Sequence, residues 1–188
     1  MSRLPPVELR RFTRVEYDRL VDQGFFDDER LELLDGLLVV KEPQGSRHAS
    51  TVIKIRQALE RAFGPKFHCR EHAPIALDRL SEPEPDVAVV RGRAGEYVDA
   101  HPAKPLLVVE VADSSLPKDR VRKSALYSRA QLPEYWVVNL VDEVLEVYRD
   151  PIKTPAGWRY RTVRLLRRGA TVAPLAAHRR VRVAALLP

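Results

Sequence analysis

The chain contains one cysteine, Cys69, so it has no internal disulfide and no cysteine spacing typical of a zinc site. We therefore expect a reducing compartment, the cytoplasm. No apolar run approaches the length of a membrane span, which predicts that the protein has no membrane partner. The N-terminal stretch MSRLPPVELRR also lacks the apolar core of a signal peptide, so we expect no secretory leader.

The composition is that of an ordinary globular protein, with 45% hydrophobic and 31% charged residues. A chain of 188 residues fits one domain, and we expect residues 1–188 to form it, with an Arg-rich C-terminal segment from about residue 159 to 188. The net charge of +6 favours an anionic partner, and nucleic acid is the obvious one. A merely basic surface would give the same charge, so composition alone does not decide.

Sequence patterns predict helices and strands in alternation. Helices are expected from a capping box at Thr13 and from apolar residues at helical spacing, at 15–23, 46–63 and 118–131. Asp35-Gly36 between two apolar runs predicts a hairpin over 30–42. Further strands are expected at 67–70, 73–77, from 86, at 106–111, from 134, at 143–148 and at 158–165, with an irregular tail over 167–188. This order predicts an α/β domain in which helices flank a mixed sheet.

Three carboxylates lie next to or within apolar segments. Asp86 directly precedes the run VAVV, Glu110 interrupts LLVVEV, and Glu32 lies among the leucines of the predicted hairpin. Alone, Asp86 would more often cap a turn, and Glu32 is uninformative. Glu110 is different, because a strand covered on both faces offers no solvent and a buried charge is normally paired or bound to a metal. A salt bridge to an arginine is the competing interpretation for Glu110.

Asp86 and Glu110 occupy comparable places on two strands, and they converge if these strands are neighbours. Two carboxylates with waters are the ligands that Mg²⁺ or Mn²⁺ prefers. A hard divalent ion beside a basic surface indicates phosphate chemistry. A cationic helper is then expected, and Lys123 shares one helix face with Asp119 and Tyr127. The competing interpretation is a solvated surface lysine paired with Asp119.

These motifs together carry a family resemblance. Pro85-Asp86, Glu110 within LVVEVADSS, the D-x-x-x-K-x-x-x-Y pattern of 119–127, and the EYW of 134–136 resemble the PD-(D/E)xK nuclease superfamily. More narrowly, the chain is similar to a large group of prokaryotic endonucleases with the restriction-endonuclease-like fold. The similarity includes LELLDGLLV and the helix opening at His48, and it spans roughly residues 12 to 150.

The resemblance implies a restriction-endonuclease-like core and metal-dependent hydrolysis of phosphodiester bonds. Asp86 and Glu110 match the acidic metal ligands, and Glu32 matches an additional carboxylate that the superfamily often supplies. Ala112 stands where the motif has lysine, and Lys123 matches a lysine moved to the following helix. The expected catalytic set is therefore Glu32, Asp86, Glu110 and Lys123, with Mg²⁺ or Mn²⁺ as cofactor and His48, Asp119 and Tyr127 as accessory candidates.

A second departure concerns the turn Gln131-Leu132-Pro133, where the group usually has Gly-Val or Gly-Ile. We expect it to affect the end of the helix alone.

Arginines near the C-terminus are the candidate nucleic-acid contacts. The expected set is Arg159, Arg161, Arg164, Arg167 and Arg168, and the tail adds Arg179, Arg180 and Arg182. The expected substrate is DNA rather than RNA. Two alternatives stay open: a non-catalytic nucleic-acid-binding protein that keeps a vestigial site, and a protein-interaction module whose acidic residues are locked in salt bridges. Retention of the four candidate catalytic residues argues against a decayed site, and a homodimer is left open.

Overall fold

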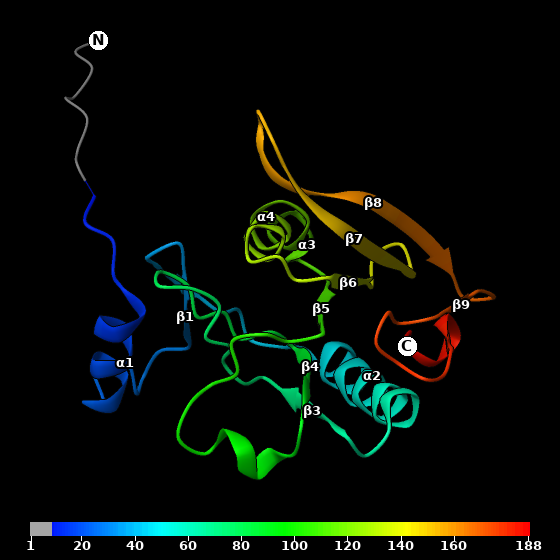
Figure 1. Ribbon diagram of the computed structural model, residues 1–188, viewed down its shortest axis with the longest axis horizontal. Coiled ribbons are helices and arrows are strands. Elements are labelled where there is room, and N and C mark those ends of the chain that lie inside the picture. Colours follow the sequence, from blue (N-terminus) through cyan, green and yellow to red (C-terminus); the bar gives the residue numbers. More distant parts are fainter. Residues whose placement is uncertain (1–8) are drawn as a thin grey trace.

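The computed structural model describes residues 9–188, in which a six-stranded mixed sheet lies between helices (Figure 1). The strand order is β3-β4-β5-β6-β7-β8, where β5 and β6 are parallel and the other neighbours are antiparallel. The strands are β3 Phe67–Glu71, β4 Val87–Arg91, β5 Leu107–Ala112, β6 Glu134–Asn139, β7 Val144–Thr154 and β8 Gly157–Arg167. The predicted α/β class, a mixed sheet flanked by helices, is confirmed.

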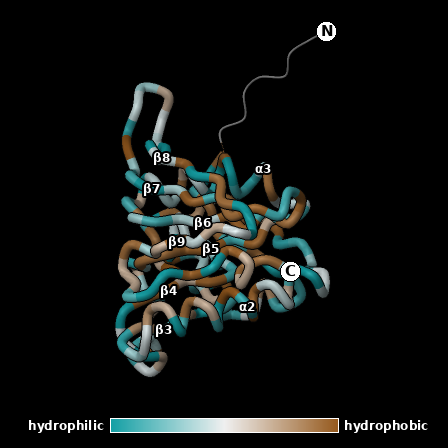
Figure 2. Tube along the Cα trace, turned by 90° about the vertical axis from the view of Figure 1, so that its right-hand side faces the viewer, coloured by the Kyte–Doolittle hydropathy of each residue, from teal (hydrophilic) through white to brown (hydrophobic). Residues whose placement is uncertain are grey.

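The central strands are covered on both faces, as their uninterrupted apolar runs predict. Every residue of β5 and β6 is buried. Helix α2 Ser46–Phe63 covers one face together with the C-terminal segment. Tyrosines from the crossover helix and from β6, β7 and β8, with Ala88 and Val108, fill the other face. Figure 2 shows the apolar residues concentrated along the central strands and the polar residues around them.

A parallel pair of neighbouring strands requires a crossover connection, and here it is helical. It comprises α3 Leu116–Lys118, a π-helical turn Asp119–Lys123 and α4 Ser124–Arg129. The predicted helix over 118–131 therefore exists, but its first half is wider than an α-helix. The turn after it contains Gln131 at φ 58°, a left-handed backbone that favours glycine.

The N-terminal elements form a layer beside the sheet. Helix α1 Arg14–Asp22 begins at the predicted capping box of Thr13 and Glu16. The hairpin pairs β1 Leu31–Leu34 with β2 Leu37–Val40 through Asp35 and Gly36, both at positive φ as a tight hairpin turn requires. Residues 1–8 of the stretch that lacks a signal-peptide core lie outside the described residues. Among residues 9–188, no helix is both long and apolar enough for a membrane span.

Three expectations need correction. Residues 73–77 form no strand, because Pro74 interrupts any ladder and the N–H groups of Ile75 and Leu77 donate to Pro83 and Ser81 instead. Strand β7 runs past 148 to Thr154, since it continues through Pro151 after its pairing with β6 has ended at Arg149, and β8 is slightly longer at both ends than the expected 158–165.

The tail is also more ordered than expected. Strands β9 Thr171–Val172 and β10 Val181–Arg182 pair with each other, and a short 3₁₀ turn, Val183–Ala185, follows. Its apolar side chains, among them Val183, Leu186 and Leu187, join the core below α2. A second 3₁₀ turn, Ala94–Tyr97, lies in the loop between β4 and β5.

Candidate active site

Strand pairing brings Asp86 and Glu110 together. The register of β4 and β5 pairs Val87 with Val109, and its extension by one residue sets Asp86 opposite Glu110. The backbone N–H of Val111 donates to Oδ2 of Asp86 at 2.7 Å, which ties the two chain segments together at this point. The condition for convergence, that the two strands are neighbours, is met, and both carboxylates are buried.

Alternation along β5 explains the direction of Glu110. Val108 and Ala112 pack on the face that carries the crossover helix, so Glu110, two residues from each, points to the same face. There its Oε1 accepts hydrogen bonds from Nζ of Lys123 at 2.9 Å and from the hydroxyl of Tyr127 at 2.8 Å. Oε2 of Glu110 accepts no hydrogen bond from the described residues, so it is the free oxygen of this carboxylate.

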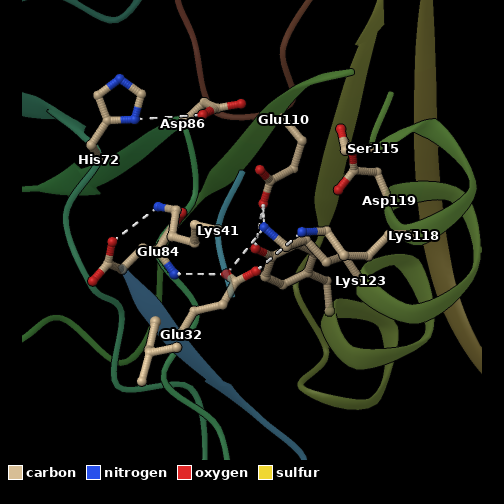
Figure 3. A network of polar contacts seen from close by, with 12 residues as sticks. Glu32, Lys41, His72, Glu84, Asp86, Glu110, Ser115, Lys118, Asp119 and Lys123 are labelled. Atoms are coloured by element: carbon tan, nitrogen blue, oxygen red, sulfur yellow. Dashed lines mark hydrogen bonds and ion pairs between the residues drawn. The ribbon is translucent and has the colours of Figure 1, made fainter. Parts of the chain in front are cut away.

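Glu32 reaches the same lysine from the hairpin. Strand β1 is buried along its length, and Oε2 of Glu32 lies 3.2 Å from Nζ of Lys123. Oε1 of Glu32 lies 3.6 Å from Nζ of Lys118, and the backbone N–H of Glu84 donates to Oε2. Figure 3 shows Glu32 and Glu110 pointing toward the ammonium of Lys123 from two sides. The structure thus places Glu32 beside the ion pair of Lys123 and Glu110.

Lys123 is buried, so the interpretation as a solvated helix lysine paired with Asp119 is wrong. The competing salt bridge of Glu110 also has a lysine, not an arginine, as its partner. Burial alone lowers the pKa of Lys123, but the nearby carboxylates, led by Glu110 and Glu32, outweigh this effect and raise the pKa well above its usual value. Lys123 therefore carries a permanent positive charge at neutral pH.

The pKa of Glu110 responds to opposing effects. Burial raises it most, Lys123 lowers it, and the charges of Asp86, Asp119 and Glu32 raise it again, to about 8. Negative charge in this cluster thus exceeds what one ammonium group offsets. An additional cation next to Glu110 would relieve this repulsion.

The π-helical turn brings Asp119 into the cluster. Asp119 is buried, and the hydroxyl of Ser115 donates to its Oδ2 at 2.7 Å. The hydroxyl of Tyr135 donates to the backbone carbonyl of Asp119 at 3.2 Å, and the backbone N–H of Ser124 donates to the same oxygen. Burial raises the pKa of Asp119, opposed by Lys123 and by the Ser115 hydrogen bond. Asp119, Lys123 and Tyr127 do face one region, as their spacing predicts.

Donors surround Asp86 on its other side. Nε2 of His48 lies 3.1 Å from Oδ2, Nε2 of Gln44 donates to Oδ1 at 3.2 Å, and Nδ1 of His72 lies 3.5 Å from Oδ1. Burial alone would raise the pKa of Asp86, but these histidines and the Val111 N–H keep it below its usual value. Burial lowers the pKa of His48, and Asp86 more than compensates, so this pKa is raised.

Sequence reasoning missed several of these neighbours. His72 has a backbone φ of 45° just after β3, and its position beside Asp86 depends on strand pairing that no local pattern reveals. Lys41 was missed as well; its Nζ lies 2.9 Å from Oε2 of Glu84. The Pro-Glu-Pro-Asp segment could have indicated Glu84, because it places Glu84 two residues before Asp86.

A cavity of about 160 Å³ opens over the cluster. Its charged lining comprises Glu32, Lys41, Glu42, Arg47, His48, Glu84, Asp86, Glu110, Asp113, Lys118, Asp119 and Lys123. Among residues 9–188, no group of three or more His, Cys, Asp or Glu side chains is arranged as a preformed metal cage. Mg²⁺ commonly uses one or two carboxylates and keeps several waters, so the free oxygen of Glu110 beside Asp86, with room for solvent, fits such an ion.

The predicted nucleic-acid arginines lie apart from this cavity. Four of them are exposed along β8: Arg159, Arg161, Arg164 and Arg167. Arg168 pairs with Glu143 at 3.2 Å, and Glu143 also pairs with Arg47 at 2.8 Å. Arg47 lines the cavity, so Arg168 is connected to the cavity through Glu143 and Arg47.

Comparison with known proteins bears on this site. Residues 14–185 match the family described as "Uma2: Putative restriction endonuclease". A similar solved structure is that of a "putative nuclease belonging to DUF820" from Anabaena variabilis ATCC 29413, with a TM-score of 0.71 and 14% identity. The match covers 93% of this chain and 97% of that one, and it shows a shared fold. Among curated proteins, no sequence match was found.

Proposed function

Because the chain belongs to the Uma2 family of putative restriction endonucleases, we propose that it hydrolyses phosphodiester bonds in DNA with a divalent cation held by Asp86 and Glu110. The observation that carries this proposal is the convergence of two buried carboxylates from adjacent strands next to the ammonium of Lys123. A structural ion pair needs one carboxylate, whereas this cluster holds an excess of negative charge beside a cavity.

Asp86 and the free Oε2 of Glu110 would hold Mg²⁺ or Mn²⁺. When bound, such an ion supplies charge stabilisation at the phosphate oxygens and makes water a better nucleophile. Asp86 is suited to this role because Gln44 and the Val111 N–H hold its two oxygens, and because His48, His72 and the Val111 N–H keep its pKa low and the carboxylate ionised.

Lys123 is proposed as the electrostatic group of the reaction. Its raised pKa keeps it protonated, so it does not accept the proton of the attacking water. It donates hydrogen bonds, and it offsets the negative charge that grows on the phosphate oxygens as the water oxygen bonds to phosphorus and the bond to the leaving oxygen breaks. Glu32 and Glu110 fix the position of this ammonium from two sides.

A non-catalytic role has one observation in its favour: Lys123 bridges Glu32 and Glu110 directly, as the central residue of a structural ion-pair cluster would. In that case the cluster is a structural ion pair, and the protein binds nucleic acid or another protein without cleaving it. The two roles differ in what a divalent ion does to the protein and to DNA.

Nicking of supercoiled plasmid tests the proposal. We expect conversion to open circles with Mg²⁺ or Mn²⁺ and none with EDTA, and we expect Glu110→Gln to abolish it. Asp113→Asn is the matched control, because Asp113 lines the same cavity but is exposed. Nicking that persists in EDTA, or that survives in Glu110→Gln, would reject this site; absence of nicking on any nucleic acid would favour the non-catalytic role.

A further inference from the structure

A second cavity, at the other end of α2 from the acidic one, is lined by arginines. It measures about 190 Å³ and lies between the second half of α2 and the C-terminal segment. Its charged lining consists of Arg61, Arg179, Arg180 and Arg182, all exposed. No acidic side chain lines it, and none of these four arginines forms an ion pair with the described residues. Their charges thus converge without compensation.

The fold holds these arginines in place. Val181 and Val183 are buried in the core, so the arginines between and beside them extend from an anchored segment. The backbone N–H of His178 donates to the carbonyl of Ala62 at 3.2 Å, which fixes the segment against α2. An anchored backbone leaves only the arginine side chains to be ordered when an anion binds, and the planar guanidinium group loses little freedom for each hydrogen bond it forms.

A stripe of basic residues on α2 joins the two cavities. Arg47, Lys54 and Arg61 are exposed and seven residues apart, so they lie nearly on one line along the helix. Arg47 lines the acidic cavity and Arg61 lines the arginine cavity. Lys54 lies between them, where its Nζ donates to the carbonyl of Leu187. At 1.5 Å per residue, the stripe is about 21 Å long.

We propose that this arginine cavity is a second phosphate-binding site that holds the backbone of duplex DNA whose scissile bond lies in the acidic cavity. The inference rests on the proposed function. Its chemistry is that of phosphate recognition, in which guanidinium groups donate paired hydrogen bonds to phosphate oxygens. A span of about 21 Å corresponds to roughly six base pairs at 3.4 Å each, so the contact lies about half a helical turn or more from the reacting phosphate.

The test variant replaces three arginines of the cavity, Arg61, Arg180 and Arg182, with glutamine. The matched control replaces Arg19, Arg79 and Arg91, which are also exposed and lie away from both cavities. Binding of a duplex of about 24 base pairs is measured in EDTA at several salt concentrations. Each lost phosphate contact should reduce the salt slope by about 0.9, so we expect a fall of about two to three and at least roughly tenfold weaker binding at low salt.

Cleavage provides the second readout. With Mg²⁺, the variant should raise the KM for the long duplex and leave kcat unchanged. On a DNA hairpin with fewer than about six base pairs beyond the scissile bond, the variant and the wild type should cleave equally well, since this DNA is too short to reach the arginine cavity. An unchanged salt slope, or an equal fall in the control, would overturn the inference. Wild-type binding without nicking would instead reject the proposed function and leave the second site standing.

Discussion

The ammonium of Lys123 and the carboxylate of Glu110 form a buried ion pair with 2.9 Å between Nζ and Oε1. Lys123 is 3% exposed and Glu110 4%. The desolvation of two such charges is repaid only when other groups complete their hydrogen bonds, and Tyr127 and Glu32 do so here. The pair therefore stabilises a particular arrangement of the crossover helix against the sheet.

Loss of the Lys123 charge should destabilise the protein strongly. Because the pKa of Lys123 is raised, its contribution is fully present at pH 7. Lys123→Met leaves Glu110 buried without a cation and Glu32 with the more distant Lys118 alone, so we expect a loss of about 3–5 kcal/mol in urea unfolding. Lys118→Met is the control, since Lys118 is partly exposed and lies 3.6 Å from Glu32; its loss should cost under about 1 kcal/mol. Equal effects would place Lys123 outside the buried cluster.

The same lysine should matter for the rate of cleavage. Lys123→Arg retains a charge, but its planar fork does not fit between two carboxylates that close on a compact ammonium. We expect kcat to fall on the order of a hundredfold or more, with DNA affinity within about threefold of wild type. Single-turnover cleavage with saturating protein measures this. A wild-type rate in a folded Lys123→Arg variant would remove Lys123 from the reaction.

The π-helical turn should depend on Arg120. Its Nε and one terminal nitrogen donate to Glu146, at 3.1 and 2.6 Å, which attaches the turn to β7. Arg120→Met frees the turn that positions Asp119 and Lys123, so we expect cleavage to slow about tenfold or more. Arg122→Met, in the same turn but exposed and without an ion pair to any of residues 9–188, should cleave as the wild type. If both variants behave alike, the Arg120 contact does not position the site.

Glu82 should make stability depend on pH. Burial raises its pKa to about 7, despite an ion pair with Arg14 at 3.6 Å. The folded pKa is above the unfolded value, so the neutral form is favoured on folding and stability falls as pH rises from about 4.5 through 7. Relative to wild type, Glu82→Gln should gain roughly 2 kcal/mol between pH 5 and pH 8 in urea unfolding. A parallel pH profile for the two proteins would contradict this.

Local patterns predicted the elements that local chemistry controls. The capping box at Thr13 starts α1, and Asp35-Gly36 forms the hairpin turn, because these signals act within a few residues. The charge within LLVVEV correctly marked Glu110 as unusual, since burial on both faces leaves a carboxylate no solvent. Gln131 takes the left-handed conformation at a position where the similar endonucleases usually have glycine. The sequence predicted a change at the end of the helix, but not this backbone conformation.

Features that depend on long-range contacts did not follow from sequence. The residues of the π-helical turn have the apolar spacing of an ordinary helix. Their contacts with Glu146 and Tyr135 join segments that are distant in sequence, so no local pattern predicts them. His72 joins Asp86 through strand pairing. The Arg-rich tail looked irregular because its buried residues are separated by loops, and its packing below α2 depends on surfaces that are distant in sequence.

Calorimetric titration with Mn²⁺ in the absence of DNA is the most direct test of the shared cation site. The wild type should bind one ion between Asp86 and Glu110, and binding should raise the melting temperature by mass action. Asp86→Asn and Glu110→Gln should each abolish both signals, while Asp113→Asn should retain them. Unchanged Mn²⁺ binding in Asp86→Asn and Glu110→Gln, or no binding by the wild type, would contradict the account.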